Sequence, residues 1–181
     1  MVRFSLLAVA TAVLIGSAAA AELDAVEKLD AKIKAKLDRD QWHPASKTFV
    51  QALWSDFKRN YEENKQSRDG RGGSDVKSYD EYLGKYVRAD GQQNRPMFEV
   101  TKTDQGRFLI KMGSHEAPAV ASEGNLVFTT GDVVYSDLPR LSDKSYCTLE
   151  MYRLTRVKGE YMMLGVHERP GERSKLKQLA E

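Results

Sequence analysis

Cysteine is almost absent from this chain, because Cys147 is the only one among 181 residues. A single thiol excludes an internal disulfide and the paired Cys-x-x-Cys arrangement of many zinc and redox sites. Apolar and polar side chains alternate around it, which places Cys147, Leu149 and Met151 on one face of a strand. We therefore expect a buried, inert thiol. The alternative is an exposed, nucleophilic Cys147, which would make the protein an enzyme.

Histidine is also scarce, and the familiar catalytic motifs are missing. His43, His115 and His167 lie far apart, and none has a second potential ligand at metal-binding spacing, so no metal site is predicted. No serine stands in a G-x-S-x-G context, and no carboxylate pair is recognisable as catalytic. The sequence identifies no catalytic residue and no cofactor, so a binding protein is favoured over an enzyme.

The chain has little excess charge, with 28 basic against 26 acidic residues and a formal net charge of +2. Such a balance provides no general attraction for nucleic acid or for an acidic membrane surface. We therefore expect no nucleic-acid partner.

Only one long apolar run is present, at residues 4–15, and it is shorter than the roughly 20 residues that cross a bilayer. Arg3 precedes it, and the small residues 18–21 follow it. This order predicts a signal peptide over residues 1–21, cleaved just before Ala21 or Glu22. The mature protein is then exported, periplasmic or secreted, without stable membrane insertion; a retained short anchor is the alternative.

The mature chain of about 160 residues is long enough for one domain with its own core. Apolar residues at helical spacing predict a pair of helices at residues 23–39 and 45–66, within a helical segment at residues 22–67. On the second helix, Phe49, Leu53 and Phe57 recur at four-residue steps with Val50, Trp54 and Tyr61 beside them, so its apolar face is expected to be broad and aromatic. Residues 68–76 are rich in glycine and charge, which indicates a linker rather than a phosphate-binding loop.

The pattern changes to an alternation of period two in residues 77–166, the predicted β domain. Short connections containing glycine, aspartate or asparagine separate the candidate strands, as in antiparallel neighbours. The predicted strands are residues 85–90, 97–103, 107–112, 125–130, 132–136, 146–156 and 160–166. The fold class is therefore α+β: a helical pair followed by an antiparallel meander that forms a small curled sheet or barrel. The polar tail, residues 167–181, is expected to be a loose end or a short surface helix.

The segment Gly84-Lys85-Tyr86, followed by a run of hairpins, resembles the G-x-W or G-x-Y opening of lipocalin-type barrels and their smaller bacterial relatives. The resemblance covers residues 84–166, and tyrosine stands where lipocalins usually have tryptophan. It implies a lipocalin-like barrel.

Two sets of residues are candidates for binding. The first consists of aromatic and methionine side chains that either line a cavity for a small apolar ligand or simply fill the core. These are Phe98, Phe108, Met112, Phe128, Tyr135, Met151 and Met162. The second lies in the predicted loops at residues 113–117 and 138–144, which would contact a partner protein. These are Ser114, His115, Glu116, Arg140 and Lys144.

The sequence thus predicts an exported, soluble binding module with a β scaffold. Its ligand would be a small apolar molecule or a protein of the cell envelope, such as an enzyme or toxin to be inhibited. An assembly protein that docks through its amphipathic helices is the alternative.

Overall fold

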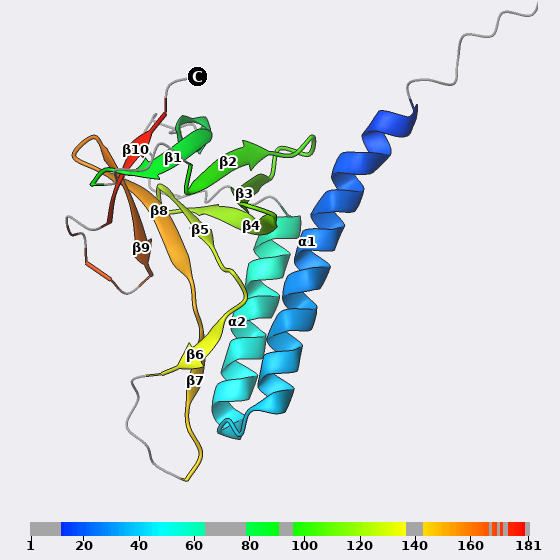
Figure 1. The fold of residues 1–181 in the computed structure, drawn as a ribbon. Coiled ribbons are helices and arrows are strands. Elements are labelled where there is room, and N and C mark those ends of the chain that lie inside the picture. The colour runs from blue at the N-terminus through cyan, green and yellow to red at the C-terminus, as the bar shows by residue number, and fades with distance from the viewer. Residues whose placement is uncertain are drawn as a thin grey trace, which may run out of the picture.

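The computed structural model shows two long helices beside a barrel of short strands, and a two-stranded extension that runs along the helices (Figure 1). It describes residues 12–63, 79–90, 96–136, 143–166, 168–169, 171 and 174–179, with the backbone alone for residues 12–24. The predicted linker, residues 68–76, lies outside the described residues.

The helices are α1 (Ala12–Arg39) and α2 (Pro44–Glu62), which confirms the predicted pair. α1 begins earlier than expected, because the alanine-rich stretch before residue 23 favours continuation of the helix. At the start of α2, the Nδ1 atom of His43 accepts a hydrogen bond from the backbone N–H of Ala45 at 3.2 Å, and Pro44 occupies the first turn.

The buried face of α2 is narrower than the broad apolar face that was predicted. The buried residues are Val50, Trp54, Phe57 and Tyr61, whereas Phe49 is 53% exposed. Steps of four residues overshoot the 3.6 residues of a helical turn, so a series of such steps drifts off one face. The alternating steps of four and three residues keep the buried set on a single line.

The strands that the structure describes form a closed barrel and a separate two-stranded sheet, and every pairing between them is antiparallel. The barrel order is β1-β10-β9-β8-β5-β4-β3-β2, and β6 pairs with β7. This confirms an α+β fold with a lipocalin-like barrel. The strands are β1 (Gly84–Arg88), β2 (Phe98–Lys102), β3 (Phe108–Met112), β4 (His115–Ser122), β5 (Asn125–Phe128), β6 (Val133–Tyr135), β7 (Cys147–Leu149), β8 (Tyr152–Val157), β9 (Glu160–Gly165) and β10 (Lys175–Gln178).

Three local predictions were wrong. Residues 113–117 were expected to be a loop, but His115 starts β4. The single strand expected at residues 146–156 is divided between β7 and β8, which belong to different sheets. The tail was expected to be a loose end or a surface helix, but its residues 175–178 form β10. This strand pairs with β1 and β9 and closes the barrel.

The barrel interior is filled by large side chains packed against small ones. On β4, Ala117 and Ala119 point inward, and Phe108 and Phe128 lie opposite Ala119 on the two neighbouring strands. Alternating large and small residues on adjacent strands lets the rings interdigitate without voids. The alanines also explain why β4 escaped prediction, since they give the strand a weak alternation of hydrophobicity.

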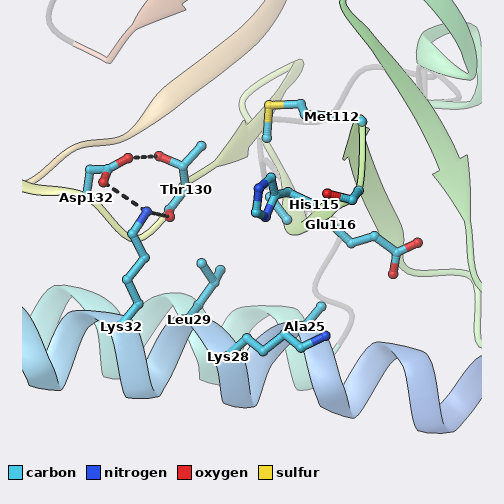
Figure 2. A pocket seen from close by; sticks show the side chains of 12 residues that line it. Ala25, Lys28, Leu29, Lys32, Met112, His115, Glu116, Thr130 and Asp132 are labelled. Carbon is cyan, nitrogen blue, oxygen red and sulfur yellow. Dashed lines mark hydrogen bonds and ion pairs between the residues drawn. The ribbon is translucent and has the colours of Figure 1, made fainter.

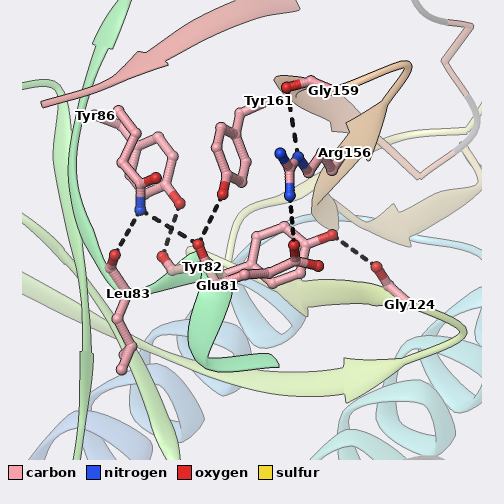
Figure 3. A network of polar contacts seen from close by, with 9 residues as sticks. Glu81, Tyr82, Leu83, Tyr86, Gly124, Arg156, Gly159 and Tyr161 are labelled. Atoms are coloured by element: carbon pink, nitrogen blue, oxygen red, sulfur yellow. Dashed lines mark hydrogen bonds and ion pairs between the residues drawn. The ribbon is translucent and has the colours of Figure 1, made fainter. Parts of the chain in front are cut away.

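A short 3-10 helix, η1 (Tyr79–Tyr82), closes one end of the barrel (Figure 3). Its backbone carbonyl at Glu81 accepts hydrogen bonds from the Tyr161 hydroxyl (2.8 Å) and the Gln178 amide (3.3 Å), and Arg156 binds the Glu81 carboxylate at 2.7 Å. The Tyr82 hydroxyl donates to the carbonyl of Gly124 at 2.7 Å. These contacts tie η1 to β8, β9, β10 and the β4–β5 turn.

The extension arises from a long, bent hairpin. β5 pairs with β8 inside the barrel, and after a short interruption β6 pairs with β7 outside it. At the bend, the buried hydroxyl of Thr129 donates to the carbonyl of Glu150 at 2.7 Å and accepts from the backbone N–H of Gly131 at 3.0 Å. The N–H of Glu150 donates to the carbonyl of Asp132 at 2.7 Å.

The extension and the helices enclose a second core. Val133, Cys147 and Leu149 from the two-stranded sheet pack with the buried faces of α1 and α2, and Val120 reaches this core from the outer face of β4. The burial of Leu29, Ile33 and Leu37 confirms the apolar stripe predicted for α1.

Gly131 permits the close approach of α1 to the bend. Its φ is +76°, and a Cβ atom there would lie 2.9 Å from the Cδ2 atom of Leu29.

We predict that Gly131→Ala lowers the free energy of unfolding by about 2 to 3 kcal/mol, from backbone strain and this clash together. Gly124→Ala is the matched control, since Gly124 also has a φ of +76° but no atom within 4 Å, and it should cost only about 1 kcal/mol. Urea denaturation measures both, and equal losses would contradict the close packing.

Candidate functional site

The candidate ligand-binding residues do not share one surface. Phe98, Phe108 and Phe128 are buried in the barrel core, and Met112 packs against its edge. Met162 lies on the opposite face of β9 from Tyr161 and Met163, which contact that core. Met151 belongs to the second core, and Tyr135 is 69% exposed, with its ring against Trp42 at a centroid distance of 4.9 Å.

A cleft of about 850 Å³ lies between α1 and the turn that joins β3 to β4 (Figure 2). One wall comes from α1, and the other comes from the β3–β4 turn and the bend of the long hairpin. The lining residues are Ala25, Lys28, Leu29, Lys32, Met112, Gly113, Ser114, His115, Glu116, Ala117, Thr130 and Asp132.

One of the two predicted partner-binding loops lines this cleft. Ser114 and His115 are exposed, and Glu116 is partly buried, with its carboxylate 3.4 Å from the Nζ atom of Lys111. From the other loop, Lys144 is exposed but does not line the cleft, and Arg140 lies outside the described residues. The structure thus brings Met112, from the ligand set, together with Ser114, His115 and Glu116.

An ion pair crosses the cleft from α1 to the bend (Figure 2). The Nζ atom of Lys32 lies 2.9 Å from the carboxylate of Asp132 and donates a hydrogen bond to the carbonyl of Thr130 at 2.8 Å. The Thr130 hydroxyl donates to the same carboxylate at 2.6 Å. Burial raises the pKa of Asp132, but the hydrogen bonds from Thr130 and Lys32 and the charges of Lys32 and Lys36 outweigh burial, so the pKa lies below its ordinary value of 3.8.

A second, smaller hollow of about 330 Å³ lies on the far side of this ion pair and shares Lys32 and Asp132 with the cleft. It continues along α1 to Lys36 and Arg39, against Gly131 and Val133. Together the two hollows follow α1 from Ala25 to Arg39, roughly 21 Å at 1.5 Å per residue. We call the two hollows together the α1 groove.

The α1 residues of the groove were missed by sequence analysis. Lys28, Lys32 and Lys36 recur at intervals of one helical turn, which is the signal that was present. The same spacing is common on a solvated helix face, and only the packing of the bend against α1 turns that face into the wall of a groove.

The single thiol is buried, as predicted. Cys147 is 2% exposed, and its sulfur lies 3.4 Å from the hydroxyl of Ser46. Burial raises the pKa of this thiol, which opposes formation of the thiolate.

Two of the histidines lie in the described residues, and each has a different environment. His43 caps α2 and stacks on Tyr146 at a centroid distance of 4.5 Å, whereas His115 lines the cleft. His167 lies outside the described residues. Across the part of the chain that the structure describes, no three His, Cys, Asp or Glu residues gather in a way that would hold a metal ion.

Comparisons with protein-family models, with curated proteins and with solved structures find no match to this chain. Within the described residues, no helix has both the length and the apolar composition needed to span a membrane.

The lowered pKa of Asp132 predicts an acid-sensitive contribution to stability. Because the folded-state pKa is below the unfolded value, the contribution is fully present above the unfolded value and disappears as pH falls through the folded value. Since the pair with Lys32 is about half exposed, we expect Asp132→Asn to lose roughly 0.5 kcal/mol at pH 7 and to match the unsubstituted protein at about pH 2. Urea denaturation at both pH values measures this difference.

Asp56→Asn is the control for that measurement, because Asp56 makes an exposed pair with Arg59 within α2, away from the groove. A loss for Asp132→Asn that is equally large in acid would show that the ion pair is not its origin.

Proposed function

We propose that this protein is an exported binding module that holds an extended segment of a partner protein in the α1 groove. The fold is compatible with a binding module, since a filled barrel is a rigid scaffold for the β3–β4 turn and the bend. The single observation that carries the proposal is the elongated groove itself, with predicted partner-contact residues Ser114, His115 and Glu116 in its wall.

The shape and exposure of the groove favour a protein segment over a small apolar ligand. An extended chain rises about 3.3 Å per residue, so a segment that lies along both hollows and displaces the Lys32–Asp132 ion pair between them is about six residues long. Lys28, Lys32, Ser114 and His115 are all exposed in its walls, whereas pockets for small apolar ligands usually enclose most of the ligand.

A small amphipathic ligand is the second candidate. Leu29 and Met112 are apolar residues of the cleft lining, and a volume of about 850 Å³ falls within the range of ligand pockets. The alternative of assembly through the apolar helix faces has less support, because those faces pack inside the second core.

Selection from a library of displayed random peptides tests the binding function. Peptides selected on the mature protein should bind Ser114→Trp about tenfold more weakly, because the indole would cover the mouth of the cleft. Asp104→Trp is the control: it lies in the exposed β2–β3 turn, at the other end of β3, and should bind as the unsubstituted protein does.

Each other outcome of this selection contradicts the proposal. Selected peptides that bind both tryptophan variants equally well would place binding elsewhere on the surface. A small ligand would be indicated instead if no peptide is enriched and the amphipathic dye 8-anilinonaphthalene-1-sulfonate binds the unsubstituted protein and Asp104→Trp but not Ser114→Trp.

Export has its own support in the sequence. The order of Arg3, an apolar run at residues 4–15 and small residues at 18–21 is that of a cleavable signal peptide. Cleavage before Ala21 or Glu22 would also leave Glu22 and Asp24 in the first turn of a shortened α1, where acidic residues favour the helix.

Production of the full chain in a bacterial host, followed by mass spectrometry of the N-terminus, tests export. We expect a mature N-terminus at Ala21 or Glu22 and recovery in the periplasm or the medium. Replacement of all four alanines at residues 18–21 by arginine should block processing at either site, because the peptidase requires small residues just before the cut. An intact N-terminus at Met1 in a cytoplasmic protein would contradict export.

A further inference from the structure

The two-stranded extension has an edge whose partner is missing from the described residues. The N–H of Glu150 donates to the carbonyl of Asp132, and the N–H of Ser136 donates to the carbonyl of Tyr146. In an antiparallel pair such hydrogen-bonded positions alternate along the strand. The backbone groups of Asp132 and Ser136 point toward β7. The N–H and C=O groups of Val133 and Tyr135 therefore point away from β7, toward the outer edge of β6.

That outer edge of β6 pairs with no strand in the part of the chain that the structure describes. Unpaired N–H and C=O groups on a strand edge are a template for an additional strand, and many domains bind extended peptides in this way. The edge opens onto the smaller hollow of the α1 groove, because Gly131, Asp132 and Val133 line that hollow opposite α1.

The helix wall of this hollow is basic. Lys32, Lys36 and Arg39 line it, while two carboxylates neutralise part of this charge: Asp132 lies 2.9 Å from Lys32, and Asp40 lies 2.9 Å from Lys36 and 3.2 Å from Arg39. Exposed ion pairs of this kind are weak, so carboxylates of an incoming segment can replace or share them.

The spacing of the cations also suits a strand. Residues four apart on a helix are separated by about 6 Å along its axis, and alternate residues of a strand are separated by about 6.6 Å. Acidic side chains at alternate positions of an extended segment can therefore lie beside Lys32 and Lys36 while its backbone pairs with β6.

We propose that β6 receives an extended, acidic segment of a partner protein as an additional strand, with carboxylates of that segment against Lys32, Lys36 and Arg39. The proposal rests on the protein-binding function of the α1 groove and names the chemistry of the segment that it binds. Exposed Tyr135 lies at the end of β6, where its ring extends the contact surface beyond the cations.

A pair of substitutions at Tyr135 tests the backbone contribution. Tyr135→Pro removes the outward N–H of β6, and proline is tolerated on a strand edge where no hydrogen bond is made. Tyr135→Thr also removes the ring but keeps the N–H. The probe is a blocked peptide that alternates glutamate and threonine, and calorimetry at low salt measures its affinity for the mature protein.

We expect the glutamate peptide to bind, the matching lysine peptide not to bind, and Tyr135→Pro to weaken binding about tenfold relative to Tyr135→Thr.

Lys36→Gln tests the contribution of the cations, and it should weaken binding several-fold and reduce its salt dependence. Lys34→Gln is the control, because Lys34 is exposed on the same helix but does not line the hollow. Circular dichroism confirms that each variant is folded.

Three results would overturn the proposal. They are no binding of the glutamate peptide, equal binding of the glutamate and lysine peptides, and equal affinities of Tyr135→Pro and Tyr135→Thr. Sedimentation of the protein alone is a further test. If the protein is a dimer and Tyr135→Pro dissociates it, the edge of β6 binds a second copy of the chain, and the proposal is wrong. These failures would not by themselves contradict the proposed function. If the library yields neutral or basic peptides whose binding is weakened by Ser114→Trp, the groove binds peptides but the segment is not an acidic strand.

Discussion

The bend of the long hairpin between the barrel and the helices is the constraint on which the rest of the structure depends. A strand pair that continued straight would remove Val133, Cys147 and Leu149 from the apolar faces of the helices. The Thr129 hydroxyl satisfies backbone groups on both sides of the interruption, at Glu150 and Gly131. The pairing can therefore leave the barrel and resume as β6 and β7 with these backbone groups hydrogen-bonded at the bend.

The α1 groove is a consequence of that bend. Gly131 brings the hairpin against Leu29, and Asp132 then lies within reach of Lys32 on α1. Because the barrel is filled and the helices are fixed by the second core, the groove has rigid walls on both sides. A rigid site loses little conformational entropy when it binds a flexible segment, which suits the proposed binding of an extended peptide.

The fold class was predictable because both periodicities are strong in the sequence. The helical stripe of Leu29, Ile33 and Leu37 and the alternation around Phe98 and Phe108 identified the helices and the sheet. β4 was not predictable from alternation, because its inward side chains are alanines that depend on the bulk of neighbouring strands. Nor was β10, since Leu176 is the only buried residue of a strand that otherwise consists of lysines and glutamine.

The candidate site was predictable only in part, because it is assembled from distant segments. The β3–β4 turn could be identified from Gly113 and the polar residues after it. The facing lysines of α1, Lys28, Lys32 and Lys36, lie 77 to 85 residues before Gly113, and nothing in the local sequence connects them to that turn. The route of the chain through the bend makes that connection, and a bend between two sheets has no strong sequence pattern beyond a single glycine.

Hydrogen–deuterium exchange of the protein tests the central claim that barrel, bend and helices form one packed unit. The account predicts that the slowest amides of α1, α2, β6 and β7 exchange through the same global opening as those of the barrel, with rates within about tenfold of each other. Helices that exchange as rapidly as isolated peptides, beside a barrel that stays protected, would contradict it.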